Sequence, residues 1–217
     1  MTQTITNTTG TADALLRAAR LIPVLTIERV EHAVPLARAL VAGGVRTLEI
    51  TLRTEAGAAA ARAIKAEVPE AVPGLGTVLT PGDLRLAEEM GLRFAFSPGA
   101  TAELLDAASS SGVALVPGIA TASELMAVRA RGITTVKLFP AEQLGGVATL
   151  RALGGPFPDA LFCPTGGITE ERISAYLALP NVVAVGGSWL APAKEVRQGN
   201  WAAITGRARR AMERIAG

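Results

Sequence analysis

Two charged residues stand in the middle of short apolar runs, where a buried charge is costly. Glu49 lies within the run 47–51 (TLEIT), and Lys137 lies within the run 135–139 (TVKLF). If both runs are buried strands, their side chains alternate between two faces, and both charges point into one interior, away from their apolar neighbours. A buried lysine amine can attack a carbonyl carbon to form a Schiff base, with a glutamate as proton shuttle.

The same two residues also permit a structural interpretation, in which they form a buried ion pair without a catalytic role. A core of small residues could have avoided the cost of desolvating two charges, which favours the catalytic hypothesis. Arg53 follows Glu49 on the same face of the run and adds a cation toward the mouth of the interior. The two interpretations therefore predict different chemistry for the same pair.

Histidine and cysteine each occur once in 217 residues, as His32 and Cys163. This excludes disulfide frameworks, zinc fingers, iron–sulfur clusters and multi-histidine metal sites within one chain, so we expect no metal, no cofactor and a reducing, cytoplasmic compartment. Of 21 basic residues only three are lysine. Lys65 and Lys194 lie in polar segments typical of a solvated surface, which leaves Lys137 as the candidate nucleophile.

Two glycine pairs are a second signal. Residues 165–168 (TGGI) follow the apolar run 161–164, and residues 186–188 (GGS) follow the run 182–185. Loops after the last two strands of a barrel often bind phosphate through backbone N–H groups, which glycine exposes closely. Ordinary turn glycines are the alternative. Two pairs at successive strand ends favour a phosphorylated substrate.

Eight apolar runs alternate with segments of helical spacing, at intervals of about 20 to 26 residues. The runs are Leu21–Thr26, Thr47–Thr51, Val72–Thr77, Phe94–Ser97, Ala114–Pro117, Thr135–Phe139, Leu161–Pro164 and Val182–Val185. The pattern predicts an α/β fold, either a (β/α)8 TIM barrel or an open doubly wound sheet. No Gly-x-Gly-x-x-Gly fingerprint follows the first run, which favours the barrel, with an extra N-terminal helix. We predict a disordered tail over 1–10 and one barrel domain over 11–217.

Composition limits the partners. The net charge is +2 and 49% of the residues are hydrophobic. Basic residues are scattered among acidic ones without an aromatic platform, so nucleic-acid binding is unsupported. The first ten residues lack the apolar region of a signal peptide, and no apolar stretch reaches membrane-spanning length. We expect a soluble protein without a nucleic-acid or membrane partner.

Six motifs recur in order along the chain from about His32 onward. They are residues 43–54 (GGVRTLEITLRT), 76–79 (GTVL), 96–99 (FSPG), 136–142 (VKLFPAE), 163–168 (CPTGGI) and 186–190 (GGSWL). In sequence and spacing this set resembles the bacterial 2-dehydro-3-deoxy-phosphogluconate (KDPG) aldolases. These are class I enzymes of the Entner–Doudoroff pathway that often also act as 4-hydroxy-2-oxoglutarate (KHG) aldolases.

The resemblance implies a homotrimeric (β/α)8 barrel without a metal, in which Lys137 is the Schiff-base lysine and Glu49 the general acid/base. The implied substrate-binding residues are Arg53, Thr77 and Thr165 around pyruvate, Pro98 and Phe139 as pocket walls, and Gly166, Gly167, Gly186, Gly187 and Ser188 in the phosphate region. The chain departs from the family at Leu75, Thr80 and Leu138, where alanine, asparagine and phenylalanine are common. We expect Leu138 to face the helices and Leu75 to narrow the interior.

The implied reaction is a retro-aldol cleavage of a phosphorylated 2-keto acid to pyruvate and glyceraldehyde 3-phosphate. Two other classes stay open. A sugar-phosphate isomerase or epimerase would use Glu49 as base and Lys137 only electrostatically, and an assembling trimer would have no activity. The preferred substrate among the phosphogluconate, phosphogalactonate and hydroxyoxoglutarate forms also stays open.

Overall fold

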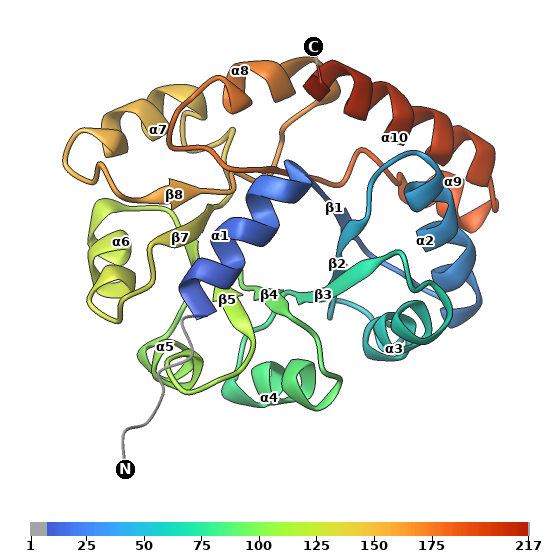
Figure 1. The fold of residues 1–217 in the computed structure, drawn as a ribbon, viewed down its shortest axis with the longest axis horizontal. Coiled ribbons are helices and arrows are strands. Elements are labelled where there is room, and N and C mark those ends of the chain that lie inside the picture. Colours follow the sequence, from blue (N-terminus) through green and yellow to red (C-terminus); the bar gives the residue numbers. More distant parts are fainter. Residues whose placement is uncertain (1–7, 217) are drawn as a thin grey trace.

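The computed structural model describes residues 8–216, and the side chains from residue 12 onward. Most of the predicted tail over 1–10 lies outside the described residues, and Thr8 already begins helix α1 (Thr8–Ala19). This is the N-terminal helix that we predicted. It leads directly into the first strand and lies across the curled strands in Figure 1.

Short parallel strands form the centre of the molecule. They are β1 (Leu21–Leu25), β2 (Thr47–Thr51), β3 (Val72–Gly76), β4 (Phe94–Phe96), β5 (Ala114–Val116), β6 (Gly118–Ile119), β7 (Thr135–Leu138), β8 (Leu161–Phe162) and β9 (Val185–Gly187). A six-stranded sheet has the order β5-β4-β3-β2-β1-β9, and a three-stranded sheet has the order β6-β7-β8. Isolated parallel bridges join Phe162 to Val182 and Thr165 to Gly186. The predicted α/β class with parallel, curled strands is confirmed (Figure 1).

Helices connect the strands and cover the outside of the curled sheet (Figure 1). They are α2 (Ala33–Ala42), α3 (Gly57–Glu67), α4 (Pro81–Glu89), α5 (Ala102–Ala108), α6 (Ala122–Arg129), α7 (Val147–Gly154), α8 (Ile173–Leu177), α9 (Ala193–Arg197) and α10 (Trp201–Ala216), with 3-10 turns η1 (Val30–His32) and η2 (Glu170–Arg172). Thr80 begins α4 with a capping box that includes Asp83. Thr80, which stands where the family commonly has asparagine, is therefore also a good N-cap residue.

Apolar side chains form two separate cores. The larger lies between the sheet and the helices and contains Leu138, as predicted, and also Leu75. Our expectation that Leu75 narrows the interior was wrong, because strand alternation turns it toward the helices while Gly74 and Gly76 face inward. A Cβ atom at Gly74 would meet the ring of Phe94, which belongs to the inner core.

The inner core fills the end of the curled sheet at which the parallel strands begin. Leu15 and Leu16 of α1 pack there with Phe94, Phe96 and the single cysteine, Cys163. Because α1 immediately precedes β1, it covers this end of the interior and leaves chemistry to the opposite end, where the strands finish. Cys163 is fully buried and packs as a small core residue.

Two of the predicted strands differ most from the structure. The fifth run, Ala114–Pro117, forms β5 only as far as Val116, and a separate short strand, β6, begins after Pro117, which has no N–H for strand pairing. The eighth strand is Val185–Gly187 rather than Val182–Val185, so Gly186 and Gly187 lie inside β9 instead of following it. A Cβ atom at Gly186 would collide with the Thr165 side chain, so this position of β9 requires glycine. The predicted strand followed the β-branched residues and therefore ended too early, at Val185.

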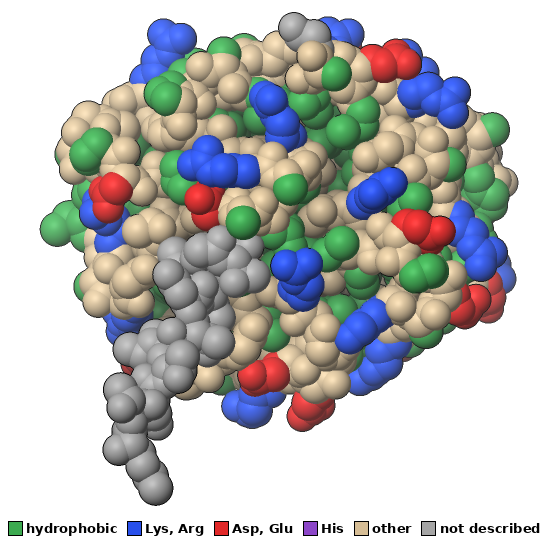
Figure 2. Space-filling view, in the orientation of Figure 1, with side chains coloured by type: hydrophobic (Ala, Val, Ile, Leu, Met, Phe, Trp, Pro, Cys, Tyr) green, Lys and Arg blue, Asp and Glu red, His purple; other side chains and the backbone are tan. Residues whose placement is uncertain are grey.

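Figure 2 shows the face that carries α1, with basic and acidic side chains dispersed over it. Within residues 8–216, no helix is both long enough and apolar enough to cross a membrane.

Candidate active site

Lys137 on β7 and Glu49 on β2 meet inside the curled sheet. The Lys137 Nζ atom lies 3.0 Å from Glu49 Oε1 and 3.3 Å from Oε2. Lys137 is 3% exposed and Glu49 is fully buried. The period-2 alternation that predicted a shared interior is therefore confirmed, since neighbours such as Leu48 and Val136 pack in the outer core. The pairing keeps either charge from standing alone in an apolar interior.

The strand next to Glu49 makes room for its carboxylate. Glu49 pairs with Gly74 in the register of β2 and β3, and Gly76 lies one step further along the same inner face. A Cβ atom at Gly76 would overlap the Glu49 carboxylate. Only glycine at position 76 therefore leaves enough space for the Glu49 carboxylate inside the curled sheet.

Aromatic rings flank the Lys137 amine. The ring centroids of Phe96 and Phe139 lie 5.1 Å and 5.6 Å from Nζ, within the range of cation–π attraction. Burial raises the pKa of the nearby Cys163 thiol to about 12, so this thiol is neutral and unreactive at physiological pH. The Cys163 thiol therefore does not compete with the Lys137 amine as a nucleophile in this interior.

Arg53 and Thr77 lie at the end of the interior where β2 and β3 finish. The Arg53 Nε–H donates a hydrogen bond of 3.1 Å to Thr77 Oγ1. Thr77 has φ of +58°, a left-handed conformation that is unfavourable for a β-branched residue. Strain of this kind is characteristic of functional sites, and here it places the hydroxyl against an exposed guanidinium. The pair offers hydrogen-bond donors suited to a carboxylate.

A cavity of about 190 Å³ opens at the same end of the interior. It is lined by Val24, Arg53, Phe139, Thr165, Gly166, Gly167, Ile168, Gly187 and Ser188. Lys137 precedes Phe139 by two residues and points in the same inward direction, so its side chain lies behind this cavity rather than on its wall. A small, partly polar cavity in front of a buried amine suits a small acidic substrate.

The glycine loop after β8 has a backbone that other residues rarely adopt. Gly166 and Gly167 have φ of +105° and +76°. A Cβ at Gly166 would press against Pro140 at 3.1 Å. Glycine is therefore required here on two counts, and the loop brings backbone to the cavity without side chains in the way.

Seven of the predicted site residues line the cavity, namely Arg53, Phe139, Thr165, Gly166, Gly167, Gly187 and Ser188. Three others, Lys137, Glu49 and Thr77, lie next to it. The structure does not bring Pro98 or Gly186 to the cavity wall. The Pro98 carbonyl packs closely on Gly118, and Gly186 packs under the Thr165 side chain. Gly186 thus acts on the site through Thr165, because its missing side chain lets that residue occupy the interior.

Val24, Phe96 and Ile168 line the cavity or flank the lysine, although no role was predicted for them. Ile168 directly follows the glycine pair, a signal that could have found it. Val24 and Phe96 are ordinary apolar strand residues, and only their inward direction at this depth distinguishes them. Within residues 8–216, no group of three or more His, Cys, Asp or Glu side chains could hold a metal ion.

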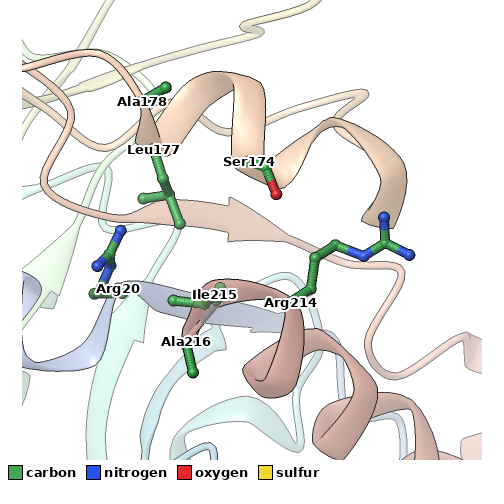
Figure 3. A pocket seen from close by; sticks show the side chains of 7 residues that line it. All are labelled: Arg20, Ser174, Leu177, Ala178, Arg214, Ile215 and Ala216. Carbon is green, nitrogen blue, oxygen red and sulfur yellow. The ribbon is translucent and has the colours of Figure 1, made fainter.

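A second hollow, of about 360 Å³, lies near the start of β1 and the end of α10 (Figure 3). Arg20 and Arg214 both line it. In Figure 3 the Arg20 guanidinium points toward Leu177, whereas that of Arg214 extends away from the hollow. The two cations do not converge on one ligand, so we place the candidate active site at the Lys137 end.

Comparisons with known proteins agree on one family. The family model "KDPG and KHG aldolase" matches residues 12–207. The 2-dehydro-3-deoxy-phosphogluconate aldolase of Pseudoalteromonas atlantica is 53% identical over 196 residues, covering 90% of this chain and 91% of its own. The KHG/KDPG aldolase of Escherichia coli is 50% identical over 202 residues, covering 93% of this chain and 95% of its own.

Solved structures show the same relationship. The KDPG aldolase of Legionella pneumophila, with pyruvate captured as a covalent carbinolamine intermediate, superposes with a TM-score of 0.89 at 44% identity, covering 92% of this chain and 97% of that one. The KDPG aldolase of Zymomonas mobilis with 3-phosphoglycerate gives a TM-score of 0.88 at 44% identity, covering 92% and 93%. This chain therefore belongs to the KDPG and KHG aldolase family.

Proposed function

We propose that this protein is a class I aldolase that cleaves 2-dehydro-3-deoxy-6-phosphogluconate to pyruvate and D-glyceraldehyde 3-phosphate. It also cleaves 4-hydroxy-2-oxoglutarate. The observation that carries the proposal is the buried contact of 3.0 Å between Lys137 Nζ and Glu49 Oε1, directly behind a small cavity. One relative is named for the first substrate and another for both, which supports this dual activity, and cleavage of the phosphogluconate form belongs to the Entner–Doudoroff pathway.

The contact between the pair provides the first proton transfer. Lys137 passes a proton to Glu49 and attacks the C2 carbonyl carbon of the substrate, forming a carbinolamine. Glu49 returns this proton to the C2 hydroxyl group, which leaves as water and gives an iminium ion, and the Glu49 carboxylate is free to accept again. Glu49, directly or through a water, then removes the proton of the C4 hydroxyl group.

The C3–C4 bond now breaks, and its electron pair moves into the iminium, which becomes an enamine. The C4 fragment leaves as the aldehyde, glyceraldehyde 3-phosphate. Glu49 returns its proton to C3 of the enamine, and water hydrolyses the resulting pyruvate imine. Pyruvate leaves and the Lys137 amine is restored, so the cycle needs no metal and no cofactor.

The remaining site residues orient the substrate. Arg53, Thr77 and Thr165 hold the carboxylate and keto end beside Lys137, and Phe139 forms an apolar wall. Gly166, Gly167, Gly187 and Ser188 bind the phosphate through N–H groups and a hydroxyl. Gly186 supports Thr165, whereas Pro98 packs against Gly118 and does not reach the cavity wall. The left-handed φ angles of the glycine loop and its position on the cavity wall support these roles.

We further propose that the two sheets close into one (β/α)8 barrel within a single domain over 11–217. The bridge between Thr165 and Gly186 connects the end of β8 to β9, and only Pro117 separates β5 from β6. A homotrimer follows from the family resemblance, and light scattering of the purified protein tests it. The single buried cysteine supports a cytoplasmic location.

Reductive trapping tests the proposed function. Incubation with pyruvate and borohydride should add the mass of a reduced pyruvate adduct at Lys137, and peptide mapping should find none at Lys65 or Lys194. Active protein that gives no adduct, or an adduct at another lysine, contradicts the mechanism. Comparing kcat/KM for the phosphogluconate, phosphogalactonate and hydroxyoxoglutarate forms then ranks the substrates.

A further inference from the structure

The loop that carries Gly166 and Gly167 is braced from outside the cavity by a side chain to which the sequence analysis assigned no role. Glu142 lies in the loop after β7, three residues beyond Phe139. Its Oε1 atom accepts a hydrogen bond of 2.6 Å from the Tyr176 hydroxyl group on α8. Its Oε2 atom lies 2.8 Å from Arg172 Nη1, in the 3-10 turn that follows the glycine loop.

The backbone and stem of Glu142 touch the glycine loop directly. The Glu142 N–H donates a hydrogen bond of 3.1 Å to the Gly166 carbonyl, next to a bond of 2.8 Å from the Ala141 N–H to the Thr165 carbonyl. A Cβ atom at Gly167 would lie 2.8 Å from the Glu142 Cβ, so the stem packs on the Gly167 α-carbon. Glu142 thus holds the loop at its start by backbone contacts and downstream by its carboxylate.

The contact with Tyr176 is the stronger of the two carboxylate contacts. Tyr176 is fully buried, whereas the Arg172 side chain is about half exposed, at 49%. Burial, together with the hydrogen bond to Glu142, raises the pKa of the Tyr176 hydroxyl, which keeps it a donor at neutral pH. An exposed ion pair adds little to stability, but here Arg172 offsets the negative charge that Glu142 brings close to an anion site.

We infer that Glu142 and Tyr176 are positioning residues that hold the Gly166–Gly167 loop in its phosphate-binding geometry and thereby set the preference for phosphorylated 2-keto acids. The inference rests on the proposed function. Two consecutive glycines with positive φ have little stiffness of their own, so contacts from outside must limit their motion. Pre-ordered N–H groups bind an anion with less loss of entropy than mobile ones.

Tyr176→Phe is the sharpest test, because it removes only the hydroxyl group and keeps the buried ring. We expect KM for the phosphorylated substrate to rise about tenfold, the effect of one hydrogen bond to a charged group. Glu142→Ala should raise this KM at least as much, and Glu142→Gln, which still accepts from Tyr176, should raise it less. The Michaelis constant for pyruvate in C3 proton exchange should change less than about twofold, since that reaction involves no phosphate.

Asp159→Ala is the matched control. Asp159 pairs with Arg129 at 2.6 Å before β8, at the other end of the strands. The Asp159→Ala variant should leave KM unchanged for every substrate. The same sugar acid without its phosphate, 2-dehydro-3-deoxygluconate, serves as the second substrate and should lose little kcat/KM in Tyr176→Phe.

An unchanged KM for the phosphorylated substrate in both Tyr176→Phe and Glu142→Ala would overturn the inference, as would equal losses on the phosphorylated and unphosphorylated substrates. A fall in melting temperature alone would assign the two residues a structural role and also overturn it. If the unaltered protein neither traps pyruvate nor cleaves the phosphorylated substrate, the proposed function itself fails, and this inference fails with it.

Discussion

The Nζ atom of Lys137 lies 3.0 Å from Oε1 of Glu49, although 88 positions separate the two residues in the chain. Both side chains are almost completely buried, so each is the principal compensation for the charge of the other. This interdependence makes the pair decisive for stability as well as for chemistry.

Loss of Lys137 alone should destabilise the fold. In Lys137→Met, the Glu49 carboxylate stays buried without its partner, and we expect the free energy of unfolding to fall by about 3–5 kcal/mol. Adding Glu49→Gln removes the uncompensated charge, so the double variant should be more stable than Lys137→Met. Urea denaturation measures both. A double variant that is the less stable of the two would contradict the interdependence.

Glu49→Gln by itself should separate the two halves of the reaction. The Lys137 amine is still present and can lose its proton to water, so pyruvate trapping by borohydride should persist. Turnover and proton exchange at C3 of pyruvate should fall by about 10²-fold or more, because the amide cannot accept the proton. Exchange is followed by NMR in deuterated water, and an undiminished rate would remove Glu49 from the proton-transfer role.

Gly76→Ala should damage the site through geometry alone. The new methyl group would overlap the Glu49 carboxylate and displace it from Lys137. We expect kcat to fall by about 10²-fold, since small misplacements of catalytic groups have effects of this size. Gly155→Ala is the control, because its φ of −63° and nearest contact of 3.6 Å accommodate a methyl group. Equal activity in the two variants would contradict this steric role of Gly76.

Thr77→Gly should separate stability from binding. Glycine relieves the left-handed strain at this position, so the melting temperature should not fall below that of the unaltered protein. The loss of the hydroxyl frees the Arg53 side chain, and KM for pyruvate should rise about threefold to tenfold. Thr77→Ser retains the hydroxyl and should keep the original KM. A lower melting temperature in Thr77→Gly would show that the strain is not released.

Cys163 should make folding stability fall at alkaline pH. Its thiol has a pKa of about 12 when folded and an ordinary pKa near 9 when unfolded, so the unfolded state releases its proton first. The stabilisation that the protonated Cys163 thiol gives to the folded state is complete below about pH 9. It is lost as the pH rises toward 12, at about 1.4 kcal/mol per pH unit. Cys163→Ala should flatten this part of the stability profile measured by urea denaturation. An identical slope in the two proteins would contradict the assignment.

Local patterns in the sequence predicted much of the candidate site. The charged residue in each of two apolar runs indicated Lys137 and Glu49, and the alternation of strand residues correctly placed them on the inner face, with Leu138 turned toward the helices. Alternation carries this information because successive side chains of a strand always point to opposite faces. The glycine pair 166–167 was likewise visible from its position after a strand.

Other parts depended on contacts between distant residues. By the same alternation rule Leu75 faces the helices, but our expectation relied on the family resemblance and placed it in the interior. Gly186 lies inside a strand because Thr165 from the neighbouring segment occupies the space of its side chain, a fact with no local signal. The brace of Glu142, Tyr176 and Arg172 joins residues up to 34 positions apart.

By itself, the sequence determined which residues carry charge, where apolar strands recur, and which side of each strand a side chain occupies, because these depend on residue type and a fixed local period. Only the tertiary structure decided that Glu49 and Lys137 lie within hydrogen-bond distance, that Gly76 leaves space for the carboxylate, and that Glu142 holds the glycine loop. Those relationships depend on the register between strands and on the packing of segments far apart in the chain, which no local pattern encodes.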